Sequence, residues 1–273
     1  AEEAIQALEG LEEGGSGGGD VTELTLHELG LGDDGAAVLA PALAKAGGLQ
    51  VLDLSGNSIG SRGCEALAEA LRHHGGLREL DLSSNGFMDH GVELLAAALQ
   101  DNEVLLRLDL GVNAITPKGV SPLAAVLRQN RVLKELDLRD NSIGQEGAGQ
   151  LAAALEVNAT LLVLDLANTG IGQQGAKALA AALQVNKTLE VANLQDNSIG
   201  LEGARCLAES LRENCSLRAL NLWHNDVGDE GAACLADALQ TNSNLLELKL
   251  GFNGISDDGA ELLAAHDVQV KDA

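Results

Sequence analysis

Apolar and polar residues alternate along this chain in a pattern that recurs every 28 residues, from about Val21 to Ala264. In the block that starts at Leu49, Leu52 and Leu54 alternate with Val51, Asp53 and Ser55, and this period of two predicts a short strand with one buried face. Residues 61–73 then place Cys64, Leu67 and Leu71 on one face at helical spacing, which predicts a helix. Each block therefore predicts one strand, one turn and one helix.

Three columns of this repeat hardly vary. The position of Leu54 is leucine in every block, as is the position of Leu39, and the position of Gly63 is always glycine. Such a unit cannot bury its apolar face alone, so neighbouring units must stack. We predict an α/β solenoid of nine 28-residue repeats, a horseshoe with parallel strands on the concave face and helices on the convex face. The glycines are expected to let each helix approach the sheet closely.

The repeat also predicts the domain boundaries. Residues 4–13 have helical apolar spacing and are followed by a Gly-rich run, so residues 1–19 are expected to be a degenerate leading helix and a flexible link. The repeat domain is expected to span residues 20–265. Residues 266–273 form a tail without a closing pattern, and no polar C-terminal cap is evident in it.

An asparagine column marks the turn after each strand. We interpret its amide groups as structural, because they can bond backbone groups that turn inward at this point. Thr169 and Leu29 interrupt the column, and we expect a weaker turn at Thr169, which has only a hydroxyl. The asparagines are Asn57, Asn85, Asn113, Asn141, Asn197, Asn225 and Asn253.

Net charge limits the classes of partner that the chain can bind, and cysteine content indicates its compartment. A net charge of −24 argues against nucleic acid and anionic membranes, which require a basic patch, and is compatible with a basic protein partner or with solubility alone. The four cysteines lack zinc or disulfide-framework spacing and are interpreted as free thiols, which favours a reducing compartment. No apolar run reaches the roughly 18 residues of a membrane span.

The block LxxLDLxxNxIGxxGAxxLAxAL, as in residues 133–155, resembles the ribonuclease-inhibitor class of leucine-rich repeat. This class includes the repeat regions of NOD-like receptors, the GTPase-activating protein for Ran and an axonemal dynein-regulatory subunit. The resemblance covers about nine-tenths of the chain and implies a horseshoe that binds proteins. The chain departs from the ribonuclease inhibitor in having one repeat length and few cysteines. A NOD-like receptor would carry a nucleotide-binding module ahead of its repeats, and the 273 residues contain no motif of such a module. No functional residues of these families can be matched to it.

A ladder of aspartates is the first candidate site. Stacked strands would place these carboxylates about 4.8 Å apart, and the resulting repulsion could be relieved by a basic partner. The alternative is that aspartate is simply common at this position and is hydrated or hydrogen-bonded. The ladder consists of Asp53, Asp81, Asp109, Asp137 and Asp165.

The few aromatic residues form the second candidate. Phe87 replaces an isoleucine of the core, whereas Trp223 occupies an outward column, and His224 and Phe252 share the next one. Exposed aromatic residues on a chain nearly free of them are typical of a binding hot spot. The alternative is a packing contact with a missing cap.

No catalytic, metal or cofactor site is expected. A calcium-like stretch from Asp81 has Val92 where glutamate is required, the Gly-rich run lacks the lysine of a phosphate loop, and the histidines form no zinc motif. Three glycosylation-like triplets, at Asn158, Asn186 and Asn214, recur with the repeat and are interpreted as structural.

The sequence thus favours a non-enzymatic scaffold for protein–protein interaction, without cofactor. We expect a cytoplasmic subunit of a hetero-oligomeric assembly, with a cytoskeletal or axonemal location as one possibility. The first alternative is a regulator of another enzyme, either a Ran-type GTPase activator or an inhibitor of a basic enzyme. The second is the repeat region of a NOD-like innate sensor.

Overall fold

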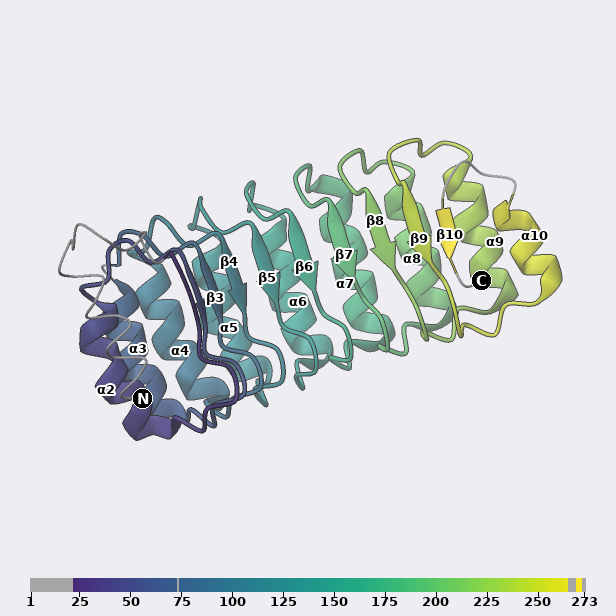
Figure 1. Ribbon diagram of the computed structural model, residues 1–273. Helices are drawn as coiled ribbons and strands as arrows, with labels where there is room; N and C mark the ends of the chain where they lie inside the picture. Colours follow the sequence, from purple (N-terminus) through teal and green to yellow (C-terminus); the bar gives the residue numbers. More distant parts are fainter. Residues whose placement is uncertain (1–21, 73, 265–268, 272–273) are drawn as a thin grey trace. The chain divides into compact units, whose positions relative to one another are not determined.

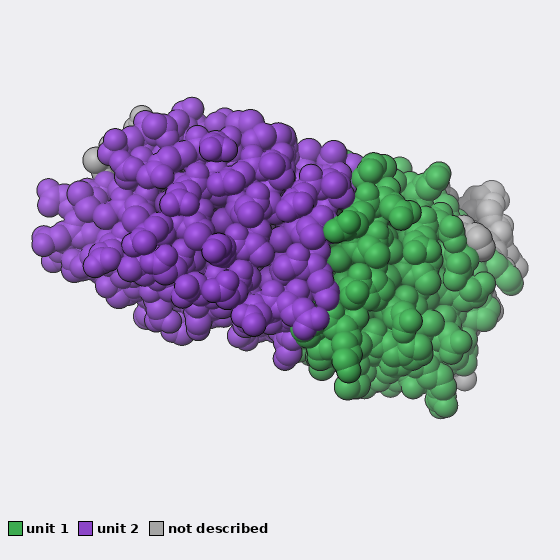
Figure 2. All heavy atoms as spheres, turned by 180° about the vertical axis from the view of Figure 1, so that it is seen from behind, with its two compact units in different colours: residues 1–136 green, residues 137–273 purple. Residues whose placement is uncertain are grey.

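The computed structural model describes residues 22–72, 74–264 and 269–271. The chain divides into two compact units, Ala1–Leu136 and Asp137–Ala273, coloured separately in Figure 2. The leading helix and Gly-rich link predicted for residues 1–19 lie outside the described residues.

The first unit contains four complete strands and the helix that follows each, within its described part. Strands β1 to β4 pair in parallel and in order, so that Leu24, Leu52, Leu80 and Leu108 lie side by side in register. The elements are β1 (Glu23–Thr25), α2 (Gly32–Leu43), β2 (Val51–Asp53), α3 (Ser61–Arg72), β3 (Glu79–Asp81), α4 (Met88–Leu99), β4 (Arg107–Asp109) and α5 (Pro117–Leu127). Strand β5 (Glu135–Asp137) spans the division of the chain.

The second unit repeats the same order. Strands β6 to β9 pair in parallel, again displaced by one repeat, and β10 continues the sheet beside β9. The elements are α6 (Gly144–Leu155), β6 (Val163–Asp165), α7 (Gly172–Val185), β7 (Val191–Asn193), α8 (Gly200–Leu211), β8 (Ala219–Asn221), α9 (Gly228–Leu239), β9 (Glu247–Lys249), α10 (Asp257–Ala264) and β10 (Gln269–Lys271).

In both units one face of the sheet is covered by helices and the other is not (Figure 1). Alternate strand residues explain this arrangement: Leu52 is buried among the helices, whereas its neighbours Val51 and Asp53 are only half-buried on the uncovered side. Leu67 and Cys64 of α3 complete the same apolar layer. The predicted α/β repeat solenoid is confirmed. We call the uncovered side of the sheet the open face.

The glycine column is required by the apolar residue four positions earlier and by the neighbouring helix, rather than by the sheet, which corrects one expectation. A Cβ atom at Gly175 would lie 2.7 Å from Cβ of Ile171 and 2.8 Å from Cβ of Ala148 in the preceding helix. At Gly203 the closest atom would be Cγ2 of Ile199, at 2.3 Å. Glycine here lets the first turn pack on the helix of the previous repeat.

Strand β10 was not predicted. Residues 269–271 fall in the tail that has no repeat pattern, yet they pair in parallel with Glu247–Lys249. Their backbone can occupy the edge of the sheet without leucines at the usual positions, because a parallel ladder needs only N–H and C=O groups.

The asparagine column forms a hydrogen-bonded ladder in each unit, interrupted at Leu29 in the first and at Thr169 in the second. Asn197 is representative: its Nδ2 donates to the carbonyls of Leu166 and Leu194, at 2.7 and 3.0 Å. Its Oδ1 accepts the amides of Thr169 and Ile171, at 3.1 and 3.2 Å. The side chain therefore closes its own turn and joins it to the preceding one.

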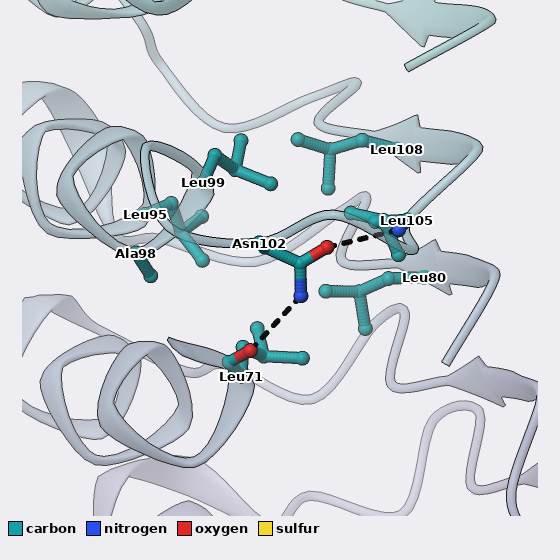
Figure 3. A pocket seen from close by; sticks show the side chains of 8 residues that line it. All are labelled: Leu71, Leu80, Leu95, Ala98, Leu99, Asn102, Leu105 and Leu108. Atoms are coloured by element: carbon teal, nitrogen blue, oxygen red, sulfur yellow. Dashed lines mark hydrogen bonds between the residues drawn. The ribbon is translucent and has the colours of Figure 1, made fainter. Parts of the chain in front are cut away.

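A second asparagine column closes the other end of each repeat, after the helix. In Figure 3, Asn102 donates to the Leu71 carbonyl of the preceding helix, 3.0 Å away, and accepts the Leu105 amide at 2.9 Å. The leucines around it line a small apolar void of about 10 Å³. Asn158, Asn186 and Asn214 lie in this column and are buried, each with its Oδ1 accepting backbone amides.

Candidate partner-binding surface

The open face carries both candidate sites. In each unit its side chains come from the first and third strand positions and from the second and third residues after the strand's end. These last two positions matter most, because they carry Trp223, His224 and Phe252.

The aspartates of the first unit bond to their own turns. The backbone amide of Ser55 donates to Oδ1 of Asp53 at 2.9 Å, and that of Ser83 donates to Oδ1 of Asp81 at 2.8 Å. Oδ1 of Asp109 accepts the Gly111 amide in the same way at 2.9 Å, and only 2% of Asp109 is exposed. Asp53 and Asp81 are half-buried on the open face, whereas Asp109 offers no accessible carboxylate to a partner.

The second unit holds the other two aspartates of the predicted ladder. Oδ1 of Asp137 accepts the Arg139 amide and its Oδ2 binds the Arg139 guanidinium at 2.5 Å. Asp165 accepts the Ala167 amide at 2.9 Å and the side-chain amide of Asn193 at 2.8 Å. These contacts support the hydrogen-bonded alternative, because the carboxylates already have donors inside the repeat.

An apolar groove crosses the open face of the second unit. Half-buried Val163, Val191 and Ala219 form its floor, from neighbouring strands β6, β7 and β8. Its volume is about 390 Å³. Asp165 lines one end of it, and Glu247 and Lys249 line the other, with 3.6 Å between Lys249 Nζ and Glu247 Oε1.

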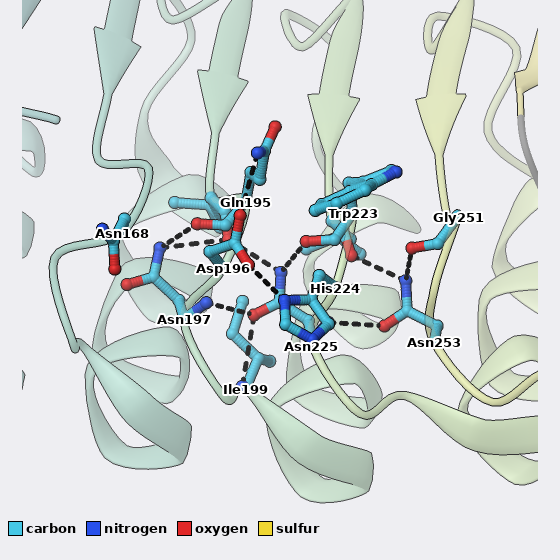
Figure 4. Close-up of polar contacts among 12 residues, drawn as sticks. Asn168, Gln195, Asp196, Asn197, Ile199, Trp223, His224, Asn225, Gly251 and Asn253 are labelled. Carbon is cyan, nitrogen blue, oxygen red and sulfur yellow. Dashed lines mark hydrogen bonds and ion pairs between the residues drawn. The ribbon is translucent and has the colours of Figure 1, made fainter. Parts of the chain in front are cut away.

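The predicted aromatic residues come together just beyond the ends of β8 and β9. Figure 4 shows two of them, Trp223 and His224. The ring centroids of Trp223 and Phe252 are 4.7 Å apart with planes inclined by 57°, and Trp223 meets His224 edge-on at 5.5 Å. Phe252 is 74% exposed, and His224 is also exposed. Trp223 is half-buried, less open than the sequence suggested, because these two neighbours cover part of it. We call these three residues the aromatic patch.

His224 is held in place by a carboxylate that sequence analysis did not single out. Its Nδ1 pairs with Oδ1 of Asp196, one repeat back in the same column, and Gln195 Nε2 donates to Asp196 Oδ2 at 2.9 Å. Burial by itself would raise the pKa of Asp196, but the hydrogen bonds from His224 and Gln195 and the charge of His224 together lower it. Asp196 is thus a stable anion beside the patch.

The column of Asp196, His224 and Phe252 is left-handed throughout. In all three residues φ is positive, at 55°, 53° and 57°. The amide of Asp196 donates to the carbonyl of Trp223, and the amide of His224 donates to the carbonyl of Gly251, each in the next repeat. The residues at the same position in the other repeats also have positive φ: Glu28, Gly56, Ser84, Val112, Asp140 and Asn168. Small polar residues tolerate this backbone, whereas a bulky residue pays roughly 1–2 kcal/mol. Such residues in this column were the overlooked signal in the sequence.

Comparison with known proteins identifies the family. A family model described as "Leucine Rich repeat" matches residues 49–68, 77–96, 101–124, 129–152, 157–180, 185–208, 213–236 and 241–264. The chain belongs to the leucine-rich repeat family. Proteins of this family are generally binding scaffolds for other proteins rather than enzymes. No curated protein matches the chain.

Two solved structures are similar to the chain at a low level. Actin-binding site 2 of leiomodin-1 is 20% identical, with a TM-score of 0.41, and the match covers 59% of this chain and 76% of that one. The C-terminal domain of tropomodulin from Caenorhabditis elegans is 16% identical, with a TM-score of 0.46, covering 55% of this chain and 92% of that one. Among the described residues, no helix has the length and apolarity needed to cross a membrane.

Proposed function

We propose that this protein is a non-enzymatic scaffold that binds a protein partner through the open face of its second unit, with the aromatic patch as the main anchor. Large exposed aromatic residues contribute most of the binding energy at protein interfaces. The patch also adjoins an apolar groove, since Trp223 follows Asn221 of that groove by two residues and its amide donates to Asn221 Oδ1 at 3.0 Å.

The observation that carries this proposal is Phe252. Its ring is 74% exposed although it packs on Trp223, with the two ring centroids 4.7 Å apart. Val112 has the same left-handed backbone but no aromatic neighbour among the described residues, so the paired rings and not the backbone set Phe252 apart. A partner that buries the Phe252 ring would remove a large apolar surface from water.

The finer assignments belong to the same proposal. The motif of residues 133–155 supports the ribonuclease-inhibitor class. The four free thiols support a reducing, cytoplasmic compartment, with the cytoskeleton or axoneme as candidate locations. We further propose that the protein is one subunit of a hetero-oligomeric assembly, in which its partner covers the open face.

Affinity capture followed by mass spectrometry tests the proposal. Wild-type protein is compared with Trp223→Ala, and with Val112→Ala as the matched control, since Val112 is an exposed apolar residue on the first unit. Partners that bind wild type and Val112→Ala but are lost with Trp223→Ala support the patch. Equal recovery with all three proteins contradicts it, as does a large drop in thermal midpoint for Trp223→Ala, which would make the residue a packing element.

The second candidate function is regulation of another enzyme, and the net charge of −24 favours an inhibitor of a basic enzyme over a GTPase activator. An inhibitor held by charge should lose affinity steeply as salt rises. Binding that varies little between low and high salt excludes this alternative and favours apolar docking at the patch. Faster phosphate release by a Ran-type GTPase would instead support the activator.

A further inference from the structure

We infer that the aromatic patch recognises an arginine side chain of the partner, carried on an extended segment that lies along the apolar groove. The inference rests on the proposed function, because it names the chemistry that the same surface would take.

The geometry of the rings is the first argument. Trp223 and Phe252 are inclined by 57° with centroids 4.7 Å apart, so the two rings pack against each other and a partner reaches their outer faces. Phe252 is 74% exposed, so a flat guanidinium can stack on the outer face of the pair, and Trp is the best aromatic partner for a cation. Lysine has no flat group to stack on such a face.

The polar groups behind the rings are the second argument. Asp196 pairs with His224, and His224 meets Trp223 edge-on, so only the His224 side chain separates this carboxylate from the rings. A wholly apolar anchor would remove water from this pair without replacing its hydrogen bonds, which is costly. A guanidinium carries five N–H donors and can replace that water.

Nearby charge agrees with a cation. The closest described basic group in the neighbouring groove is Lys249, and Glu247 lies 3.6 Å from its ammonium group. Glu247 therefore offsets the one charge in the groove that would repel an arginine. The chain as a whole, at −24, attracts basic segments from a distance.

The groove defines the rest of the segment. Its floor of Val163, Val191 and Ala219 crosses three adjacent strands, which suits small aliphatic side chains rather than a second charged group. An extended segment with valine or alanine next to an arginine matches this surface in shape and polarity.

Fluorescence tests the inference directly, because Trp223 is the only tryptophan and the chain has no tyrosine. The probe is a short acetylated, amidated peptide with a single arginine flanked by valine and alanine, titrated into the full chain. Matched peptides contain citrulline, which is flat but uncharged, or lysine in place of that arginine. We expect the arginine peptide to shift Trp223 emission and shield it from acrylamide, with affinity about tenfold above the citrulline peptide.

Variants complete the test. Phe252→Ala should weaken the arginine peptide about tenfold and bring it close to the citrulline peptide, whereas Val112→Ala should leave both affinities unchanged. Circular dichroism confirms that each variant is folded. Equal affinity for arginine and citrulline peptides overturns the inference, as does the absence of any change in Trp223 emission. If the arginine inference fails but Trp223→Ala still abolishes capture of a protein partner, the proposed function stands on its own.

Discussion

At the scale of single residues, one carbon atom separates a tolerated position from a forbidden one in this repeat. Gly175 and Gly149 both lie in helices of the second unit, but an added Cβ at Gly175 meets Ile171 and Ala148 below 3 Å, while at Gly149 it meets nothing within 4 Å. Close packing therefore requires glycine at position 175 but leaves room for a side chain at position 149.

We predict that Gly175→Ala destabilises the protein by about 1–3 kcal/mol, because the helix must shift to avoid overpacking. Gly149→Ala is the control and should raise stability by about 0.5–1 kcal/mol, since alanine loses less entropy in a helix. Urea denaturation of both variants measures the difference. Equal effects of the two substitutions would refute the close-approach explanation.

Thr169 tests the asparagine ladder. Its hydroxyl reaches the Leu166 carbonyl at 2.6 Å, whereas Asn197 in the next repeat donates to three carbonyls and accepts two amides. We predict that Thr169→Asn raises the free energy of unfolding by about 1 kcal/mol through the added amide bonds. The reciprocal change, Asn197→Thr, should lower it by at least as much, and thermal unfolding would show an opposite shift for each. A decrease for Thr169→Asn would mean that the turn already satisfies its backbone.

At the scale of elements, helices begin in two different ways. Helix α5 begins after Thr116, whose amide donates to Asp89 of the preceding helix at 2.7 Å, and Gly119 donates to the same carboxylate at 3.1 Å. Where this position is not aspartate, the next helix begins with a left-handed residue: Gly172 follows Gln145, and Met88 follows Ser61. The acidic first turns therefore serve the next helix as well as their own.

We predict that Asp89→Ala destabilises the protein by about 1–2 kcal/mol, because it removes acceptors from the first turn of α5. Gln145→Ala occupies the same repeat position and should change stability by less than about 0.5 kcal/mol. Chemical denaturation of the two variants gives the comparison. A loss at Gln145 as large as that at Asp89 would show that the position matters for packing and not for capping.

His74 gives one helix end a pH dependence. It replaces asparagine in the second column, is buried, and its Nδ1 accepts the amides of Gly76 and Leu77 at 3.2 and 3.0 Å. Among described residues its Nε2 has no hydrogen-bond partner of normal geometry. Burial lowers the pKa of His74 below 6.5, opposed in part by the Ala46 carbonyl.

Because the unfolded chain binds a proton that native His74 resists, this residue contributes its full stability above pH 6.5 and loses it as pH falls through the native pKa. We predict that His74→Asn reduces the loss of stability between pH 7.5 and pH 5.5. Urea midpoints of wild type and variant at both pH values measure it. An identical loss in the two proteins would assign the acid sensitivity to other groups.

The sequence predicts the elements well and the site only in part. Leucine and asparagine columns are read directly, because their roles repeat in every block and depend on local geometry. The pairing of Asp196 with His224 depends on which residues occupy one column in two consecutive repeats, and the left-handed backbone of that column becomes visible only when the turns are built. The half-burial of Trp223 and the burial of Asp109 likewise arise from neighbours that no single repeat specifies.

At the scale of the whole molecule, the invariant residues build the stack and the variable ones form its surface. Buried leucines and asparagines recur in both units, so they carry stability and not selectivity. The open face differs between the units: the first presents Asp53 and Asp81, while the second adds an apolar groove and the aromatic patch. A scaffold of this kind selects its partner through the few positions that the repeat leaves free.

The substitution Phe252→Gly tests the central claim most directly, because it separates binding from stability. Glycine relieves a left-handed strain of about 1–2 kcal/mol but gives up the contact with Trp223, worth about 0.5–1.5 kcal/mol, so unfolding should change by less than about 1 kcal/mol. Val112→Gly relieves the same strain in the first unit and serves as control. The measurement is partner affinity beside the free energy of unfolding for both variants. We predict at least a tenfold loss of affinity for Phe252→Gly alone; wild-type affinity in that variant, with stability preserved, would contradict the account.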